Sequence, residues 1–415
     1  MRYRTRKRHI IASVIICTLL VLFWRISIFR STGKQQLDRR LAELRQQGYP
    51  TALTELEAYD RLPEGADNAA PLYLQALADC TECIIDLPLF ERDLPLTAQA
   101  LDPADEQLIK DILADFNDVL VPLHQAADLK HCRYPHDPNT GLSVIHDQLI
   151  RVQKLVLLLS LQSHWHADHN HAPAAYESLR ASIALTQSLD APLLLFHLSM
   201  NIHRVATIRS LQRVLNRVAL SDQSLVNLLR SLAAWQASDG LARAWAGERC
   251  MTLAPLQRKM SGSFVLSLWD WLGLLSRHII KFIDLMQEQI DTARLPAHQQ
   301  SAAAQKLAEA NKALRSPLLR MIVPQFSGHF QRNLISVAHA RVAYTALAIE
   351  RYHLATGHWP TTLDVLSPQY LSSVPLDPFD GLPLRYEKQP HGFRVYSLGP
   401  ENGEEISFNV ERELK

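Results

Sequence analysis

The segment 164–169 gathers the side chains in this chain that are best suited to metal chemistry. It reads HWHADH, so three imidazoles and one carboxylate fall within six residues. Imidazole nitrogens and carboxylate oxygens are the usual ligands of catalytic zinc, which turns a bound water into a nucleophile near neutral pH. The segment therefore indicates a zinc site with His164, His166, Asp168 and His169 as ligands, where Asp168 could also act on the bound water.

The spacing resembles the H-x-H-x-D-H signature of the metallo-β-lactamase superfamily, and the resemblance implies zinc-dependent hydrolysis. That superfamily continues with a Gly-Gly turn inside an αββα sandwich, whereas here Asn170, His171, Ala172 and Pro173 follow and the flanks have helical patterns. A motif supports a function only in its expected structural context. The sequence therefore favours a polar corner between two helices and no catalytic site, with a zinc-dependent hydrolase on 164–169 as the alternative.

Two cysteines form a second candidate. Cys80 and Cys83 have the spacing of a zinc or redox motif, to which His131 and Cys132 could add ligands. The other interpretation is a disulfide, drawn from Cys80, Cys83, Cys132 and Cys250 in an exported body. Spacing alone leaves the pairing open, because four cysteines allow three connectivities.

The N-terminus has the pattern of a membrane anchor. Residues 2–8 hold five basic side chains and no acid, and an apolar run from Ile10 to Trp24 can be extended to Phe29 across Arg25. Arg25 can reach the headgroups and Trp24 suits the interface. No small-x-small cleavage site follows the run. We therefore expect a single-pass protein of the bacterial inner membrane, with a cytoplasmic segment at 1–9, an uncleaved span at 10–29 and an exported (periplasmic) body. The alternative is a cleaved signal peptide.

The charge balance differs between the two ends of the chain. Residues 1–45 contain 11 basic and 2 acidic residues, which leaves 32 basic and 40 acidic residues in the remainder. An acidic exported body argues against nucleic acid as a partner, because phosphates require basic surfaces.

Helical patterns dominate residues 30–325, which we expect to form a bundle of hairpin-like helices. Asp102-Pro103 is a favoured helix start, and that helix should reach about Leu129. The patterns at 174–189, 192–220 and 221–236 predict successive helices joined by short links. Residues 263–286 carry too many charges for a second span, so we expect one core or interfacial helix there.

The end of the chain, 331–415, predicts a helix over 331–356 that stops at Gly357, followed by strands at 384–388 and 393–398. Its punctuating residues are Tyr352, Gly357, Trp359, Pro360, Pro368, Tyr370, Leu371, Pro375, Asp377, Pro378, Phe379, Gly381, Tyr386, Tyr396, Ser397 and Gly399. This pattern resembles the C-terminal domain of the major pseudopilin (protein G) of type II secretion. The resemblance implies a small α+β domain and a calcium site in the following loop, at Glu401, Asn402 and Glu404.

The whole chain is similar to an uncharacterised bacterial family of anchored helical proteins that end in this domain. The pseudopilin N-terminal peptidase site is missing, so we do not expect a filament subunit. The predicted fold is mainly α: a transmembrane helix, a repeat-like helical bundle and a pseudopilin-like α+β end. The predicted function is that of an envelope scaffold or interaction protein, linked to secretion machinery of the type II kind. It would need no cofactor, and it would contact the bilayer through 10–29 and an envelope protein through its body.

Overall fold

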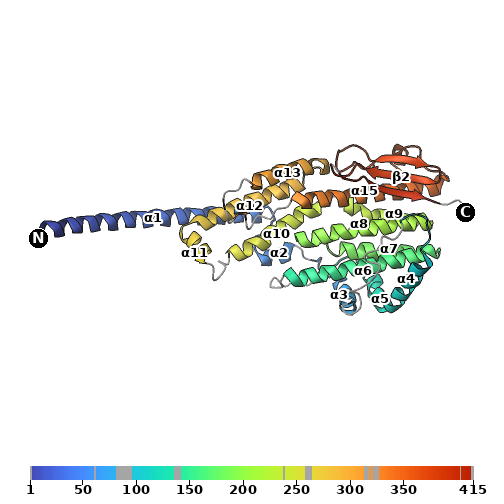
Figure 1. Cartoon of the computed structure of the whole chain (residues 1–415), viewed down its shortest axis with the longest axis horizontal. Helices are drawn as coiled ribbons and strands as arrows, with labels where there is room; N and C mark the ends of the chain where they lie inside the picture. The colour runs from blue at the N-terminus through green and yellow to red at the C-terminus, as the bar shows by residue number, and fades with distance from the viewer. Residues whose placement is uncertain are drawn as a thin grey trace. The chain divides into compact units, whose positions relative to one another are not determined.

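The computed structural model describes residues 2–59, 62–80, 96–134, 142–236, 239–257, 264–312, 316, 319–320, 327–401 and 403–412. It is mainly helical with a small antiparallel sheet near the C-terminus, which confirms the predicted fold class (Figure 1). Two compact units are present. The first comprises Met1–Tyr59, Trp245–Ile290 and Glu309–Gln325, and the second comprises Asp60–Ala244, Asp291–Ala308 and Phe326–Lys415.

Helix α1 (Arg2–Gln46) runs without a break from the basic N-terminus to the body of the first unit. It ends at Gly48, which has a positive φ of 80°. The Gly48 amide donates to the Arg45 carbonyl at 3.0 Å and the Tyr49 amide donates to the Leu44 carbonyl at 3.0 Å. These bonds satisfy carbonyls that the helix end would leave open. The helix that contains the predicted span therefore continues well beyond it, to Gln46.

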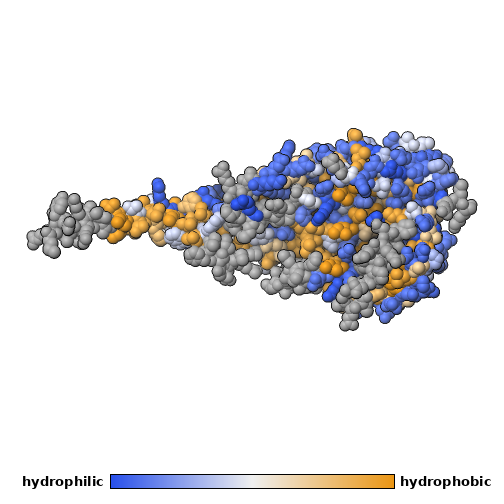
Figure 2. All heavy atoms as spheres, viewed as in Figure 1, coloured by the Kyte–Doolittle hydropathy of each residue, from blue (hydrophilic) through white to orange (hydrophobic). Residues whose placement is uncertain are grey.

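The membrane-length part of α1 is exposed. Ten large apolar side chains between Val14 and Ile28 are 47–65% exposed, and Ile26 is half-buried. Figure 2 shows this stretch of the helix as mainly apolar at its surface. By length and composition this helix can cross a membrane, as either a signal anchor or a signal sequence. The predicted span at 10–29 falls on it, although the side chains before Val14 lie outside the described part.

The first unit contains further helices besides α1. They are α2 (Leu53–Tyr59), the part of α10 (Asp239–Gln257) from Trp245 onward, α11 (Phe264–Trp271) and most of α12 (Leu274–Ala293). Helix α1 contacts α11. Its Arg40 binds Asp284 of α12 at 3.1 Å, and its Arg45 binds Glu55 of α2 at 2.8 Å.

The prediction of one helix over 263–286 is wrong, because Gly273 separates α11 from α12 at φ 72°. A Cβ on Gly273 would lie 2.7 Å from Arg30 Cα. Only glycine allows this approach of two backbones, and Arg30 binds Asp270 at 2.6 Å beside it.

The second unit contains most of the predicted hairpin-like helices, and α6, α7 and α8 lie side by side in Figure 1. Its helices before the C-terminal segment are α3 (Ala70–Asp79), α4 (Pro103–Asp115), α5 (Asn117–Ala126), α6 (Leu142–Asp168), α7 (Ala172–Gln187), α8 (Leu194–Arg217), α9 (Asp222–Ala233), the 3-10 turn η2 (Ala234–Gln236) and most of α13 (Ala297–Lys312). Local signals explain the starts: Asp102 accepts from the Ala104 amide at 2.8 Å, with Pro103 at the first helical position.

The predicted single helix from Pro103 to Leu129 is wrong in one respect. The chain leaves helical geometry at Phe116, with φ −105° and ψ 17°, so α4 and α5 are separate and α5 ends at Ala126. Phe116 is buried. The turn therefore brings apolar residues of both helices to the core of the unit, an arrangement that a straight helix would not give.

The C-terminal segment consists of α15 (Ser327–Thr356), the 3-10 turn η3 (Leu363–Leu366) and the strands β1 (Arg385–Gln389), β2 (Gly392–Ser397) and β3 (Ile406–Glu411). The strands are antiparallel in the order β1-β2-β3, with Val395 opposite Phe408. The helix, its stop at Gly357 (φ 76°) and the first two strands agree with the prediction. The third strand was not predicted.

One apolar core joins this segment to the helices before it. Buried residues of α7, α8 and α9 belong to the same cluster as those of α15 and the sheet. The proposed division at 30–325 and 331–415 therefore does not follow the compact units, since the second unit contains both parts. The cause is α15, whose Val337, Ala338, Ala340, Val342 and Ala343 are all fully buried. A helix that is apolar on every side lies in the centre of a core.

We predict that Trp359→Ala destabilises the whole second unit in one transition. Trp359 is 8% exposed, stacks on His353 with ring centroids 3.7 Å apart and packs against Phe393. Removing a buried aromatic ring typically costs about 3–5 kcal/mol. Thermal unfolding followed by circular dichroism, with limited proteolysis, measures the effect. Leu354→Ala, at a 45% exposed position of α15, is the control. A protease-resistant fragment ending near Pro324 would instead show that the C-terminal segment folds as a separate domain.

Candidate functional site

The residues of the proposed zinc motif lie at the end of α6 and in the corner that follows it. Asp168 is the last residue of α6, and Asn170 turns the chain with φ 58° before α7 begins at Ala172. The polar corner between two helices that the sequence favoured is therefore present. The apolar run at 155–161 lies within α6, so it forms no strand.

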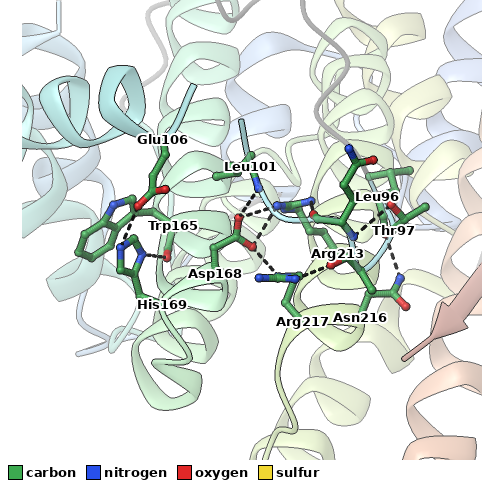
Figure 3. A network of polar contacts seen from close by, with 12 residues as sticks. Leu96, Thr97, Leu101, Glu106, Trp165, Asp168, His169, Arg213, Asn216 and Arg217 are labelled. Carbon is green, nitrogen blue, oxygen red and sulfur yellow. Dashed lines mark hydrogen bonds and ion pairs between the residues drawn. The ribbon is translucent and has the colours of Figure 1, made fainter. Parts of the chain in front are cut away.

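The Asp168 carboxylate is the centre of a buried polar network (Figure 3). Arg213 Nη2 donates to both carboxylate oxygens, at 2.7 and 3.0 Å, and Arg217 Nε donates to Oδ1 at 2.8 Å. The Leu101 amide donates to Oδ2 at 3.1 Å. The side chain of Arg213 is fully buried and that of Asp168 is 8% exposed. Such charge-assisted, bidentate bonds fix geometry strongly.

The same network holds the segment 96–101 and the sheet. Arg213 Nη1 donates to the Gln99 carbonyl at 3.3 Å, and Arg217 donates to the Ala98 carbonyl. Asn216 Nδ2 donates to the carbonyls of Leu96 at 2.9 Å and Asn409 at 3.0 Å. Its Oδ1 accepts from the Glu411 amide at 2.7 Å. One turn of α8 therefore connects the end of α6, the segment before α4 and strand β3.

The three histidines of the motif have separate surroundings. His164 is 5% exposed, and neither of its ring nitrogens has a hydrogen-bond partner among the described residues. Burial and the nearby Arg213 lower its pKa to about 3, so it is neutral. Burial, followed by the charges of neighbouring histidines, lowers the pKa of His166. His169 lies 3.2 Å from Glu106 and bonds the Trp165 carbonyl at 2.8 Å (Figure 3).

This arrangement gives the zinc alternative no support. The described residues include no group of three or more His, Cys, Asp and Glu side chains that could hold a metal ion. The Asp168 oxygens are occupied by two guanidinium groups and an amide. A metal at His164, His166, Asp168 and His169 would have to displace Arg213, whose buried charge would then lose its partner.

The cysteine candidates are only partly within the described residues, because Cys83 lies outside them. Cys132 and Cys250 are free thiols, and burial raises the pKa of each to about 12. A thiol with a raised pKa is a poor nucleophile and a poor metal ligand. His131 instead takes part in a β-bridge with Asn68.

The acidic end of the chain also divides into structural and exposed residues. Asp377 is fully buried, and its carboxylate accepts from Arg385 at 2.6 Å, the Leu398 amide at 2.8 Å and Ser397 at 2.9 Å. It therefore holds the turn before β1 against the end of β2. Glu401 and Glu404 are exposed, and Asn402 lies outside the described residues. The calcium site remains a prediction.

Sequence reasoning missed the buried arginines. Arg204 and Arg213 on α8, and Arg249 on α10, are each at most 8% exposed. Arg204 lies four residues after the buried Met200 and four before the buried Ile208. A basic residue on the apolar stripe of a helix was the signal that could have found it, since arginine is rarely buried without a partner.

We predict that Asp168→Asn costs about 3–5 kcal/mol of unfolding free energy, because it leaves the buried Arg213 without its counter-charge. Denaturant unfolding measures the difference. Glu106→Gln, which changes a 45% exposed carboxylate in the same network, should stay within about 0.5 kcal/mol. A stable Asp168→Asn protein that had lost bound zinc would instead support the hydrolase.

We also predict that acid destabilises the second unit through its buried histidines. Burial lowers the pKa of His164 to about 3 and those of His197 and His203 to about 4. The unfolded chain takes up protons below about pH 6.5, whereas the folded chain does not, so stability falls as the pH drops from about 7 towards 4. At pH 5 each of these histidines lowers the unfolding free energy by about 1–2 kcal/mol relative to neutral pH.

His164→Phe is the variant that tests this, because His164 makes no hydrogen bond to the described residues. Its unfolding free energy should depend less on pH between about 7 and 4 than that of the parent protein. An unchanged pH dependence would mean that His164 is charged in the folded protein.

Comparisons with known proteins find no match: no family model fits the chain, and no curated protein or solved structure is significantly similar to it. The function must therefore be argued from this chain alone, and the resemblance to a pseudopilin domain remains an expectation.

Proposed function

We propose that this chain is a membrane-anchored interaction protein of the bacterial envelope, with an exported helical body that presents a docking surface to another envelope protein. The observation that carries the proposal is the exposed apolar stretch of α1, where ten large side chains between Val14 and Ile28 are 47–65% exposed. Apolar exposure of this extent along one helix is costly in water and favourable in a bilayer.

The charge distribution supports the orientation. The basic residues at 2–8 precede this stretch without an acidic residue among them, which favours retention of that end in the cytoplasm. The acidic remainder of the chain then lies on the other side of the membrane.

The use of the polar side chains supports binding over catalysis. The buried acids in the two segments that the sequence singled out make structural contacts. Asp168 pairs with Arg213 and Arg217, and Asp377 binds Arg385 and Ser397. Buried polar groups with satisfied partners specify a fold and leave no activated nucleophile or base.

A candidate docking surface lies on the C-terminal segment. Leu376, Leu382 and Leu398 are 45–59% exposed. Leu376 precedes Asp377, the Asp377 amide donates to the Leu382 carbonyl, and the Leu398 amide donates to the Asp377 carboxylate. Three exposed leucines therefore gather at one buried aspartate, and we call them the Asp377 leucines. The pseudopilin-like pattern of this segment makes secretion machinery of the type II kind the first partner to test.

The topology has a direct test. A phosphatase fused after Lys415 should be active, whereas the same fusion to a chain lacking residues 2–29 should be inactive and no longer sediment with membranes. An active reporter that functions only in the cytoplasm, placed at the same site, would overturn the orientation.

The docking surface is tested by crosslinking in intact cells, with pseudopilins as the first candidate partners. Leu382→Ser should weaken the crosslink and leave the melting temperature nearly unchanged, because surface changes typically stay within about 0.5 kcal/mol. Val121→Ser, at a 47% exposed position of α5, is the matched control. Equal crosslinking of both variants would show that the Asp377 leucines are not the docking surface.

A further inference from the structure

The second unit contains a basic cleft of about 620 Å³. That volume lies in the range of pockets that take small molecules. Among the described residues of its lining, Lys130, Arg133, Arg204 and Arg243 contribute four positive charges and Asp190 one negative charge. The Asp190 carboxylate already accepts a bond from Arg243 at 3.0 Å. The cleft therefore has an excess of positive charge.

Arg204 is the unusual member of the lining. It is 8% exposed, and in the described part of the chain it makes no hydrogen bond or ion pair. Its guanidinium lies over the ring of Trp235, 5.3 Å from the centroid. Burial lowers its pKa to about 10, so it is charged at neutral pH. Asp190 acts on it through its charge but accepts no hydrogen bond from it. A buried cation without a directly bonded anion destabilises a fold, and such a residue facing a cleft is a candidate ligand-binding group.

Trp235 gives a second, independent indication. It is fully buried at the cleft, and its indole nitrogen has no hydrogen-bond partner. Buried tryptophans normally find an acceptor for this N–H. The cleft lining thus combines a guanidinium with an aromatic residue whose N–H is unbonded among the described residues.

Another part of the cleft lining is held in place. Asn68 accepts from the Arg133 amide at 2.9 Å and donates to the Arg133 carbonyl at 3.0 Å. It also forms a β-bridge with His131. The segment 130–133 that supplies Lys130 and Arg133 is therefore fixed before any ligand arrives, and such preorganisation favours binding.

We infer that this cleft binds a small organic anion, with its carboxylate or phosphate group at Arg204 and its apolar part against Trp235 and Met200. The guanidinium fork matches two oxygens of such a group. Met200 and Trp235 supply the apolar wall. The inference is independent of the membrane topology and of the Asp377 leucines.

Phenyl phosphate is a suitable probe, since it combines an oxyanion with an aromatic ring. Calorimetric titration of the full chain in a neutral detergent, at low salt, should show one binding site. Arg204→Met should weaken binding at least about thirty-fold, as expected for losing a desolvated charge partner. Arg230→Met removes an exposed arginine of α9 outside the cleft and should bind as the parent does. Benzoate and inorganic phosphate separate the contributions of the oxyanion and the ring.

The melting temperature without probe provides a second readout. Arg204→Met should be at least as stable as the parent, because it removes an unpaired buried charge of similar volume. Arg213→Met should be far less stable, since it leaves Asp168 unpaired. The inference is overturned if the parent binds none of the three probes at millimolar concentration, if Arg204→Met binds as the parent does, or if Arg204→Met unfolds as Arg213→Met does.

Discussion

The ion pair between Asp168 and Arg213 is the contact on which the second unit depends most. Both side chains are nearly or fully buried, and the carboxylate also holds Arg217 and the Leu101 amide. Through the neighbouring Asn216, the same turn of α8 reaches strand β3. Segments that are more than two hundred residues apart in sequence are thus fixed by one set of charges. Buried ions are weak sources of stability, and their best-attested role is to select one arrangement over others.

Local signals predicted much of the fold, and tertiary contacts explain the rest. The Asp102-Pro103 pair gave the start of α4 and Gly357 gave the end of α15, because these depend on a few neighbouring residues. The break at Gly273 depends on the backbone of Arg30 and could not be seen in the pattern at 263–286. Strand β3 does alternate, with Ile406, Phe408 and Val410 buried, but it follows a run of acids that indicated a loop. The apolar residues of α15 between Val337 and Ala343 occur on all sides of the helix and were a signal for a shared core.

The HWHADH segment shows why the spacing of residues in a sequence does not by itself define a metal site. On a helix, successive residues turn by about 100°, so His164 and Asp168 share a face whereas His166 lies nearly opposite. The three motif residues within α6 therefore do not converge on one ion, and His169 follows the end of the helix, although the same letters on a strand and loop could. The buried partners of Asp168 were missed for a related reason: arginine is usually at the surface, so a sequence interpretation places it there. Nothing in the sequence near 164–169 points to Arg213, which is 45 positions away.

The two buried arginines of α8 differ in their role: Arg213 stabilises the fold, whereas Arg204 does not. Arg213 has a carboxylate, and removing either partner would leave a charge stranded in the core. Arg204, nine positions earlier, has an aromatic ring and a cleft in place of a carboxylate. A fold selected only for stability would replace Arg204 with an apolar residue of similar size, because the ring offers less than the desolvation costs. Arg204 has no carboxylate bonded to it within the core, so its retention is best explained by a ligand that binds it from the cleft.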